Sequence, residues 1–371
     1  MSIASLAVPG IRGLTPYQPG KPIAELEREF GLRRIVKLAS NENPLGASPK
    51  ALEVVRRILA GSHLYPDGSG FELKATLAEK LGVDPAQIVL GNGSNDVLDL
   101  VARVFLAPGL NAVYSEHAFA VYPIATQTAG AEGKAAPAHD GGRGPRFGHD
   151  LEAMLDRVDA DTRVVFVANP NNPTGTLLGR SELHSFLSAL PERIVVVVDE
   201  AYFEYASSHD YPNALDWLRE FPGLIVTRTF SKAYGLAGLR VGYAVTGAEV
   251  ADLLNRARQP FNVNALGLAA AAAALEDAEF LEATVRANDT GLRRLEAGLH
   301  GRSLDFIPSA GNFLSFDLGR TAGPVFDALL REGVIVRPVG NYGLPNHLRV
   351  SVGTVEEIDI FFAALDRVLG R

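Results

Sequence analysis

The sequence predicts an α/β fold, in which a doubly wound domain with a mostly parallel sheet is followed by a smaller α+β domain. Short Val-rich runs alternate with helical patterns between residues 87 and 258. Continuous runs of this kind are typical of strands buried on both faces, and the alternation favours parallel βαβ units. The length of 371 residues suggests about two domains.

The elements of the first domain are expected in the following order. The first 38 residues are rich in proline and should form an extended arm. Four strands are predicted from runs of β-branched residues that end at turns, over Gln87–Leu90, Arg163–Ala168, Arg193–Val198 and Leu224–Thr227. One helix is predicted over DVLDLVARVFL, after the first of these strands, and another over Ala248–Arg258.

Pro260 marks the predicted domain boundary, because proline ends a helix and biases the preceding residue away from the α region. We therefore expect an N-terminal arm over 1–38, a large α/β domain over 39–262 and a small C-terminal domain over 263–371. The expected elements of the small domain are helices over 265–275 and 278–300 and short strands near 312–317, 334–337 and 348–352.

Charge and composition exclude several classes of protein. Lys and Arg total 35 against 43 for Asp and Glu, so the net charge is −8, and the chain does not have the basic character of a general nucleic-acid binder. The chain has no cysteine, which excludes disulfides, thiolate metal sites and cysteine nucleophiles. The 8 histidines show no ligand spacing, so no metal site is expected.

The sequence also predicts a cytoplasmic protein. The longest apolar run lies within 265–275 and is shorter than the roughly 20 residues that span a bilayer. The N-terminus, MSIASLAVPG, lacks the basic and apolar regions of a signal peptide. We therefore expect no membrane partner.

Two polar segments follow predicted strands, at the sheet edge where ligands of doubly wound folds bind. The turn GNGSND (91–96) either presents unpaired backbone N–H groups to a phosphate or only caps the next helix through Ser94 or Asn95. Asp199 follows four valines and either holds a protonated ring nitrogen of a ligand or caps a helix.

Two further segments carry a nucleophile and directed donors. Lys232, in TFSKAYGLAGLR, can form a Schiff base with a carbonyl if it is desolvated, and Arg240 would compensate a phosphate. The tight turn NPNNPTG directs the amide of Asn172. A lysine, a carboxylate for a pyridinium nitrogen, hydrogen-bond donors and a phosphate cradle are the parts that pyridoxal phosphate needs.

These segments together resemble a known family. NPNNPTG (169–175), DEAY (199–202) and TFSKAYGLAGLRVGY (229–243), in this order and spacing, are similar to the fold type I pyridoxal-phosphate aminotransferases. LTPYQPG (14–20) and FNVN (261–264) resemble more narrowly the histidinol-phosphate aminotransferases within that family. The resemblance implies a mostly parallel, seven-stranded type of sheet between helices and a smaller α+β C-terminal domain.

The resemblance also implies roles for individual residues. Lys232 would form the Schiff base and move a proton, Asp199 would pair with the pyridine nitrogen, and Tyr202 would hydrogen-bond the ring oxygen. The other implied cofactor ligands are Ser94, Asn95, Phe119, Asn172, Thr229, Ser231, Arg240 and, from the partner of a homodimer, Tyr65. The implied substrate contacts are Arg349 for an α-carboxylate and Arg337 and Tyr17 for the distal end of the substrate.

The implied reaction moves an amino group between histidinol phosphate and 2-oxoglutarate, giving imidazole-acetol phosphate and glutamate. Transamination of phenylalanine or tyrosine on the same scaffold is the alternative, and decarboxylation of a phosphorylated amino acid is a further one. A non-catalytic cofactor-binding regulator is disfavoured, because the acidic chain has little room for a DNA-binding domain before its sheet.

Glycine is the unusual feature of the composition, with 37 copies or about 10% of the chain against an ordinary level of about 7%. Five of these glycines lie in turns that follow or adjoin the segments above, and there we expect backbone to approach the cofactor closely. They are Gly91, Gly93, Gly175, Gly235 and Gly238.

Overall fold

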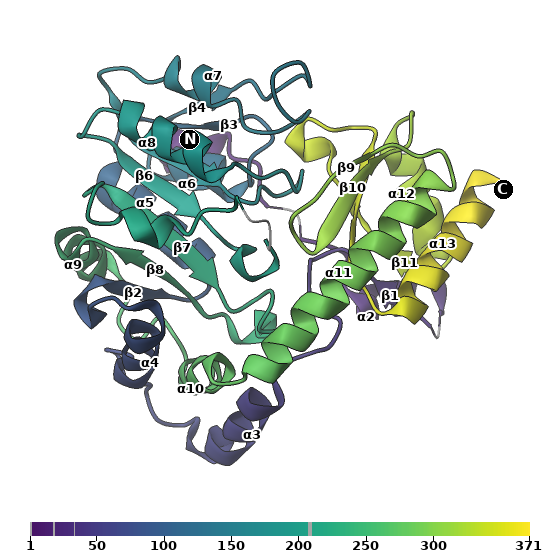
Figure 1. Ribbon diagram of the computed structural model, residues 1–371, viewed down its shortest axis with the longest axis horizontal. Helices are drawn as coiled ribbons and strands as arrows, with labels where there is room; N and C mark the ends of the chain where they lie inside the picture. Colours follow the sequence, from purple (N-terminus) through teal and green to yellow (C-terminus); the bar gives the residue numbers. More distant parts are fainter. Residues whose placement is uncertain (1, 18, 33, 207–209) are drawn as a thin grey trace.

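A computed structural model describes residues 2–17, 19–32, 34–206 and 210–371 (Figure 1). Its larger part contains a seven-stranded sheet with the strand order β2-β8-β7-β6-β5-β3-β4. The strands are β2 (Ile88–Gly91), β3 (Asn111–Ser115), β4 (Glu132–Ala136), β5 (Thr162–Ala168), β6 (Val195–Asp199), β7 (Leu224–Thr229) and β8 (Gly242–Thr246). Only β8 is antiparallel to its neighbours, so the mostly parallel sheet predicted from the sequence is confirmed.

Both faces of this sheet are buried, because alternate side chains of each strand enter two separate cores. In β5, Val164 and Phe166 pack on one face, while Val165 and Val167 pack on the other. Full burial of a side chain such as Phe166 contributes about 1.5–3 kcal/mol. The helices on the first face are α5 (Ser94–Phe105), α6 (Val121–Thr128) and α9 (Ala248–Ala257). Those on the second are α3 (Pro49–Ile58), α4 (Phe71–Leu81), α7 (Leu151–Leu155), α8 (Arg180–Ala189) and α10 (Ala265–Leu275).

The predicted strands of this sheet are present, with changed ends. The strand expected from Arg193 begins only at Val195, because Ile194 N–H closes a turn onto the carbonyl of Pro191 at 3.0 Å. The same strand continues to include Asp199, so this carboxylate belongs to β6 and not to a helix cap.

The smaller part contains a four-stranded antiparallel sheet with the order β12-β13-β10-β9. Its strands are β9 (Phe306–Ile307), β10 (Phe313–Asp317), β12 (Arg337–Pro338) and β13 (His347–Ser351). The helices that pack around it are α11 (Ala278–His300), α12 (Ala322–Arg331) and α13 (Val355–Leu369). In Figure 1, α11 runs obliquely from the larger part to the smaller part.

The expectation of an extended arm over the first 38 residues is partly wrong. This segment contains α1 (Pro9–Arg12), α2 (Ile23–Phe30) and β1 (Val36–Lys37), which pairs in parallel with β11 (Val334–Ile335). Helix α2 forms because the prolines precede it, Gly31 ends it in the left-handed region with φ 66°, and Leu26 is fully buried. The arm therefore docks on the smaller part through α2 and β1.

Helix α10 lies within the segment that we expect to belong to the small domain, yet it packs against α3 and α4 of the larger part. Its Ala270 and Ala274 are buried in the core on the second face of the large sheet. The expected boundary after residue 262 stays a prediction, and this packing favours a division after α10.

Short 3-10 helices complete the fold, and none of the described helices has the length and apolar character needed to cross a membrane. They are η1 (Ile3–Leu6), η2 (Leu59–Gly61), η3 (Pro85–Gln87), η4 (Phe203–Tyr205), η5 (Ala214–Trp217), η6 (Ala237–Leu239) and η7 (Gly340–Tyr342).

Candidate active site

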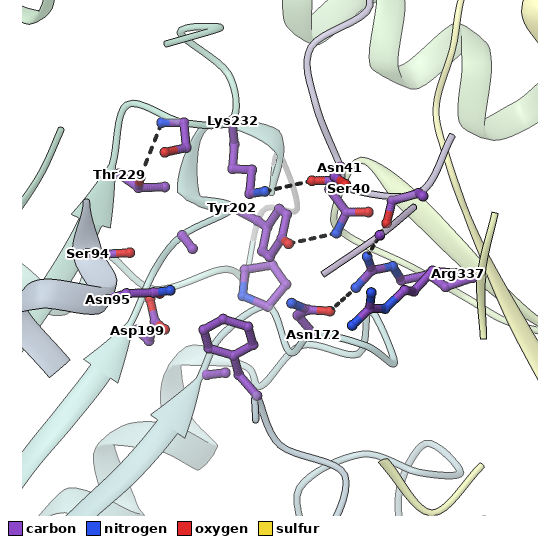
Figure 2. A pocket seen from close by; sticks show the side chains of 18 of the residues that line it. Ser40, Asn41, Ser94, Asn95, Asn172, Asp199, Tyr202, Thr229, Lys232 and Arg337 are labelled. Atoms are coloured by element: carbon purple, nitrogen blue, oxygen red, sulfur yellow. Dashed lines mark hydrogen bonds between the residues drawn. The ribbon is translucent and has the colours of Figure 1, made fainter. Parts of the chain in front are cut away.

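A pocket lies at the carboxyl ends of the parallel strands, between the two parts of the molecule (Figure 2). The predicted site residues that line it are Tyr17, Ser94, Asn95, Phe119, Asn172, Asp199, Tyr202, Thr229, Ser231, Lys232, Arg240, Arg337 and Arg349. Ser94, Asn95 and Thr229 lie on one side and Arg337 on the opposite side, with Lys232 and Tyr202 between them (Figure 2). The fold therefore brings together residues as far apart in the chain as Tyr17 and Arg349.

One side of the pocket is the N-terminus of α5. Gly93 is the N-cap residue and Ser94 is the first helical residue, so neither Ser94 nor Asn95 caps the helix as expected. No side-chain cap bond satisfies this helix end among the described residues. Its unpaired N–H groups and the positive end of the helix dipole are a binding site for an anion such as phosphate.

Arg240 adds a positive charge beside this helix end. Its Nη1 donates to Ser231 Oγ at 3.3 Å and to the carbonyl of Ala237 at 3.0 Å. A Cβ on Gly93 would lie 2.2 Å from Arg240 Nη2, so the glycine makes room for the guanidinium. Thr229 Oγ1 accepts the backbone N–H of Ser231 at 3.1 Å, which folds the strand end toward the same point.

Asp199 is buried at the end of β6, with only 5% of its surface exposed. Its Oδ2 accepts a hydrogen bond from the hydroxyl of Tyr122 at 2.8 Å, and its Oδ1 accepts one from Thr227 Oγ1 at 3.0 Å. Burial raises the pKa of Asp199, and the hydrogen bonds from Tyr122 and Thr227 oppose this rise. A carboxylate held in this way is suited to a cationic partner inside the pocket.

Lys232 follows β7 and directs its amine into the pocket, where Nζ donates to the carbonyl of Ser40 at 3.0 Å. Burial lowers the pKa of Lys232 to about 7, and the positive charge of Arg349 contributes to this. A lysine with this pKa is largely neutral at slightly alkaline pH, so its lone pair can attack a carbonyl carbon.

Tyr202 and Asn172 supply polar groups near this amine. The Tyr202 hydroxyl accepts from Asn41 Nδ2 at 2.8 Å, and burial raises the pKa of Tyr202 to about 12. Asn172 Oδ1 accepts from Arg349, and in Figure 2 the nitrogen end of this amide faces the middle of the pocket. The pocket therefore holds a protonated phenol and a directed amide donor.

The opposite side of the pocket carries two arginines from the smaller sheet. Arg349 lies on β13, is 6% exposed and donates through Nη2 to the carbonyl of Ala39 at 2.8 Å. Arg337 lies on β12, directly opposite Arg349 in the strand pairing, and its guanidinium lies 5.5 Å from the ring centre of Tyr17. This pairing explains why two arginines separated by a long loop face one cavity.

Tyr65 is the one predicted site residue outside the pocket. Its side chain is 83% exposed and stacks on Phe261, with the ring centres 4.8 Å apart. Within one chain Tyr65 therefore makes no contribution to this site, and its expected action on a partner subunit stays a prediction.

Three of the residues that form this site were not identified from the sequence. Asn41 and the carbonyl of Ser40 belong to the segment SNENPLG, and Tyr122 belongs to HAFAVYP. Tyr122 follows Phe119 by three positions, across the turn that leads into α6, where the backbone N–H of Tyr122 donates to the carbonyl of Phe119 at 3.1 Å. That spacing could have indicated Tyr122, whereas a backbone carbonyl such as that of Ser40 leaves no side-chain signal.

Two of the turn glycines allow protein atoms to pack closely beside the pocket. Gly93 and Gly235 have positive φ angles of 82° and 69°, and each makes room for protein atoms. A Cβ on Gly235 would lie 1.9 Å from the carbonyl oxygen of Gly46, and one on Gly238 would meet none of the described atoms within 4 Å. Gly93 and Gly235 therefore permit close packing around the pocket, and the expected approach of the five glycines to the cofactor stays a prediction.

The fold and pocket define a class of enzyme, because a reactive lysine, a buried carboxylate and an anion site lie together at the strand ends of a fold type I sheet. The family model for class I and II aminotransferases matches residues 33–365. The chain therefore belongs to the class I and II aminotransferase family.

Comparison with individual proteins gives close relatives. The chain is 84% identical to histidinol-phosphate aminotransferase 2 of Methylococcus capsulatus over 100% of both chains. It is 62% identical to histidinol-phosphate aminotransferase 2 of Pseudomonas aeruginosa, over 99% of this chain and 98% of the relative. The crystal structure of histidinol-phosphate aminotransferase from Sinorhizobium meliloti, in complex with pyridoxal-5'-phosphate, superposes with a TM-score of 0.90 at 31% identity, covering 99% and 98% of the two chains.

Proposed function

We propose that this enzyme transfers an amino group from histidinol phosphate to 2-oxoglutarate, giving imidazole-acetol phosphate and glutamate, a step of histidine biosynthesis. The observation that carries the proposal is the 84% identity, over full length, to a histidinol-phosphate aminotransferase. The relatives give no support to the alternative aromatic amino acid aminotransferase or to a decarboxylase.

The pocket fits pyridoxal 5'-phosphate as the cofactor. The phosphate would bind the N–H groups at Ser94 and Asn95 and the guanidinium of Arg240, because a helix N-terminus without a side-chain cap requires an anion or water. Thr229 and Ser231 would add hydroxyl donors on the same side. When bound, the cofactor supplies a conjugated, electron-withdrawing ring that accepts electrons from the substrate Cα.

The remaining residues would hold the cofactor ring. Asp199 would pair with the pyridine nitrogen, because it is a buried carboxylate that lines the pocket and keeps acceptor capacity beside its bonds from Tyr122, Thr227 and the backbone N–H of Ala201. Tyr202 and Asn172 would donate to the ring oxygen, and Phe119 would pack against the ring face. Lys232 would bind the cofactor covalently and then, as a free amine, carry the proton from the substrate Cα.

The two arginines would bind the substrate. Arg349 hydrogen-bonds only neutral oxygens in the contacts described above, those of Asn172 and Ala39, so its charge is available for the α-carboxylate of glutamate. Arg337 and Tyr17 would contact the distal end of the substrate. Histidinol phosphate is dianionic at its phosphate, so we assign its recognition chiefly to Arg337.

We further propose that the protein acts as a homodimer in the cytoplasm, with Tyr65 of each subunit reaching the partner's cofactor phosphate. The exposed, stacked pair of Tyr65 and Phe261 supports this, since exposed aromatic pairs are typical of interfaces. We propose that the chain divides into an arm, 1–38, a large domain and a small domain, and that the boundary expected between residues 262 and 263 lies instead after α10, which packs on the large domain.

The substrate assignment is tested by comparing kcat/KM for histidinol phosphate, phenylalanine and tyrosine. We expect histidinol phosphate to be preferred, and Arg337→Ala to lower its kcat/KM about 10- to 100-fold, because hydrogen bonds to charged groups contribute about 1.5–3 kcal/mol. Phenylalanine should lose much less. Arg320→Ala, at an exposed arginine of the same part of the molecule, is the control and should leave both values unchanged. Equal losses for the two substrates would contradict phosphate recognition by Arg337.

A further inference from the structure

Tyr122 is a buried tyrosine beneath the pocket that the proposed reaction does not yet use. It lies on α6, is fully buried, and is not part of the pocket lining. Its ring stacks on Phe166 of β5 with the ring centres 4.8 Å apart and the planes 6° from parallel. The stack supports the ring in an orientation in which its hydroxyl reaches Asp199.

The hydroxyl of Tyr122 ends on the carboxylate that faces the pocket. It donates to Asp199 Oδ2 at 2.8 Å, while Thr227 donates to Oδ1 at 3.0 Å. These donors approach the carboxylate from two different elements, α6 and β7, so they restrict rotation of the carboxylate plane. The backbone N–H of Ala201 also bonds this carboxylate, and the acceptor capacity that remains faces the pocket, which Asp199 lines.

The same tyrosine also supports the ring that lines the pocket wall. Phe119 packs edge-on against Tyr122, with the ring centres 6.0 Å apart and the planes at 86°. Phe119 lines the pocket and Tyr122 does not. One buried side chain thus contacts both the group expected at the cofactor nitrogen and the group expected at the cofactor face.

Removal of the Tyr122 hydroxyl would shift Asp199 from the anionic form toward the neutral acid. Burial already favours the neutral acid, and the two hydroxyl donors favour the anion. An anionic Asp199 is the state that pairs with a protonated pyridine nitrogen. A hydroxyl donor lost from a buried carboxylate is not replaced by water, because the site around Tyr122 is closed.

We propose that Tyr122 is a positioning residue for the cofactor ring, which acts through its hydrogen bond to Asp199 and holds that carboxylate in register with the pyridine nitrogen. The inference rests on the proposed use of pyridoxal phosphate. Tyr122 does not contact substrate or cofactor, so its contribution depends on the ring nitrogen being present.

The test measures the equilibrium affinity of the apoprotein for two ligands by absorbance titration. One ligand is pyridoxal 5'-phosphate, and the other is its analogue with a C–H group in place of the ring nitrogen. Tyr122→Phe keeps both ring contacts and removes only the hydroxyl. We expect its dissociation constant for pyridoxal phosphate to rise about tenfold or more, whereas the value for the carbon analogue should change less than about twofold, because that ring has no nitrogen for Asp199 to hold.

The control is Tyr114→Phe, which removes a hydroxyl from another tyrosine of the same hydrophobic core and should change neither affinity. An equal loss of affinity for both ligands in Tyr122→Phe would overturn the proposal in favour of a purely structural role, and so would unchanged binding of pyridoxal phosphate. If the parent protein bound neither ligand, the proposed function itself would fail, so the two failures are distinguishable. Thermal unfolding of each apoprotein identifies any variant that is not folded.

Discussion

Lys232 lines the pocket and has an ionisation that is strongly altered by its surroundings. Burial lowers its pKa from the ordinary value of 10.5 to about 7, and the charges of Arg349 and Arg240 act in the same direction, while Glu42 opposes them. The amine must lose a proton before it attacks a carbonyl, so this shift makes Lys232 reactive near neutral pH. The arginines that we propose to bind anions therefore also favour the neutral, reactive form of the lysine.

The rate of covalent cofactor uptake should follow this pKa. A lowered pKa means that the neutral amine predominates above about pH 7 and the ammonium below it. We expect the rate at which apoprotein reacts with pyridoxal phosphate to rise with pH up to about 7 and then to level off. Stopped-flow absorbance on both sides of that value measures it, and borohydride reduction followed by peptide mapping identifies Lys232 as the modified residue.

Two variants sharpen this measurement. Arg349→Gln removes a positive charge near the amine and should move the midpoint of the pH profile of the uptake rate to higher pH. Lys232→Ala should give no borohydride-stable product. A small free amine, titrated in parallel, corrects for ionisation of the cofactor itself. A rate that continues to rise toward the ordinary lysine value of 10.5 would contradict the lowered pKa.

At the scale of elements, the N-terminus of α5 depends on a glycine. Gly93 has φ 82° and ψ 163°, a region that residues with a Cβ avoid at a cost of about 1–3 kcal/mol. The space that its side chain would occupy belongs to Arg240. The anion site therefore combines a helix end, a glycine and a guanidinium from a distant turn.

Gly93→Ala should weaken phosphate binding specifically. The added Cβ displaces Arg240, so we expect the dissociation constant for pyridoxal phosphate to rise about tenfold or more, while that for pyridoxal, which lacks the phosphate, changes little. Gly238→Ala is the matched control, since a Cβ there meets none of the described atoms within 4 Å. Equal losses for the two ligands in Gly93→Ala would point to general misfolding, and thermal unfolding separates that case.

The sequence predicted strands β2, β5, β6 and β7 of the large sheet and missed β3, β4 and β8. The Val-rich strands β5, β6 and β7 and the helices α10 and α11 were identified because their apolar runs match their burial. Strand β4 was missed because it is an edge strand, with the largely exposed sequence EGKAA. Strands β3 and β8 are buried inside the sheet, but their sequences, NAVYS and GYAVT, lack the continuous run of β-branched residues that revealed the other strands.

Site residues that belong to a sequence motif could be predicted. Contacts that depend on how two distant elements pack could not. Lys232 and Asp199 lie in recognisable segments that follow strands, and both line the pocket. The hydrogen bond from Tyr122 to Asp199 joins residues 77 positions apart, and its existence depends on how α6 packs on β5. Such contacts follow from tertiary packing, which local sequence patterns do not specify.

At the scale of the whole molecule, the single chain exposes three large aromatic side chains on its surface. Tyr65 is 83% exposed, Phe71 is 68% exposed and Phe261 is 46% exposed. Arg258, close to Phe261, donates to the carbonyl of Gly68 at 2.8 Å, which ties the two aromatic segments together. A fixed, apolar and exposed surface of this kind is suited to a second copy of the chain.

The proposed homodimer predicts that a mixed dimer will recover activity lost in two variants. Lys232→Ala removes the reactive amine, and Tyr65→Ala removes the group expected to cross the interface. Each variant alone should be impaired at both sites. In a mixed dimer, the Tyr65→Ala subunit retains Lys232 and receives Tyr65 from its partner, so one of the two sites is intact and about half of the parental kcat per dimer should return.

The mixed dimer distinguishes action of Tyr65 on the partner's site from action within its own chain. If Tyr65 acted within its own chain, neither subunit of the mixed dimer would hold an intact site, and mixing would restore nothing. Differently tagged variants, co-expressed and purified through both tags, supply the mixed dimer. Lys232→Ala paired with Arg240→Ala is the control: both residues line the same pocket of one chain, so in a mixed dimer each subunit lacks one essential group and no recovery is expected. Recovery in the Tyr65 pairing alone would assign Tyr65 to the partner's site. If no activity returned, Tyr65 would act within its own chain or would not belong to the site.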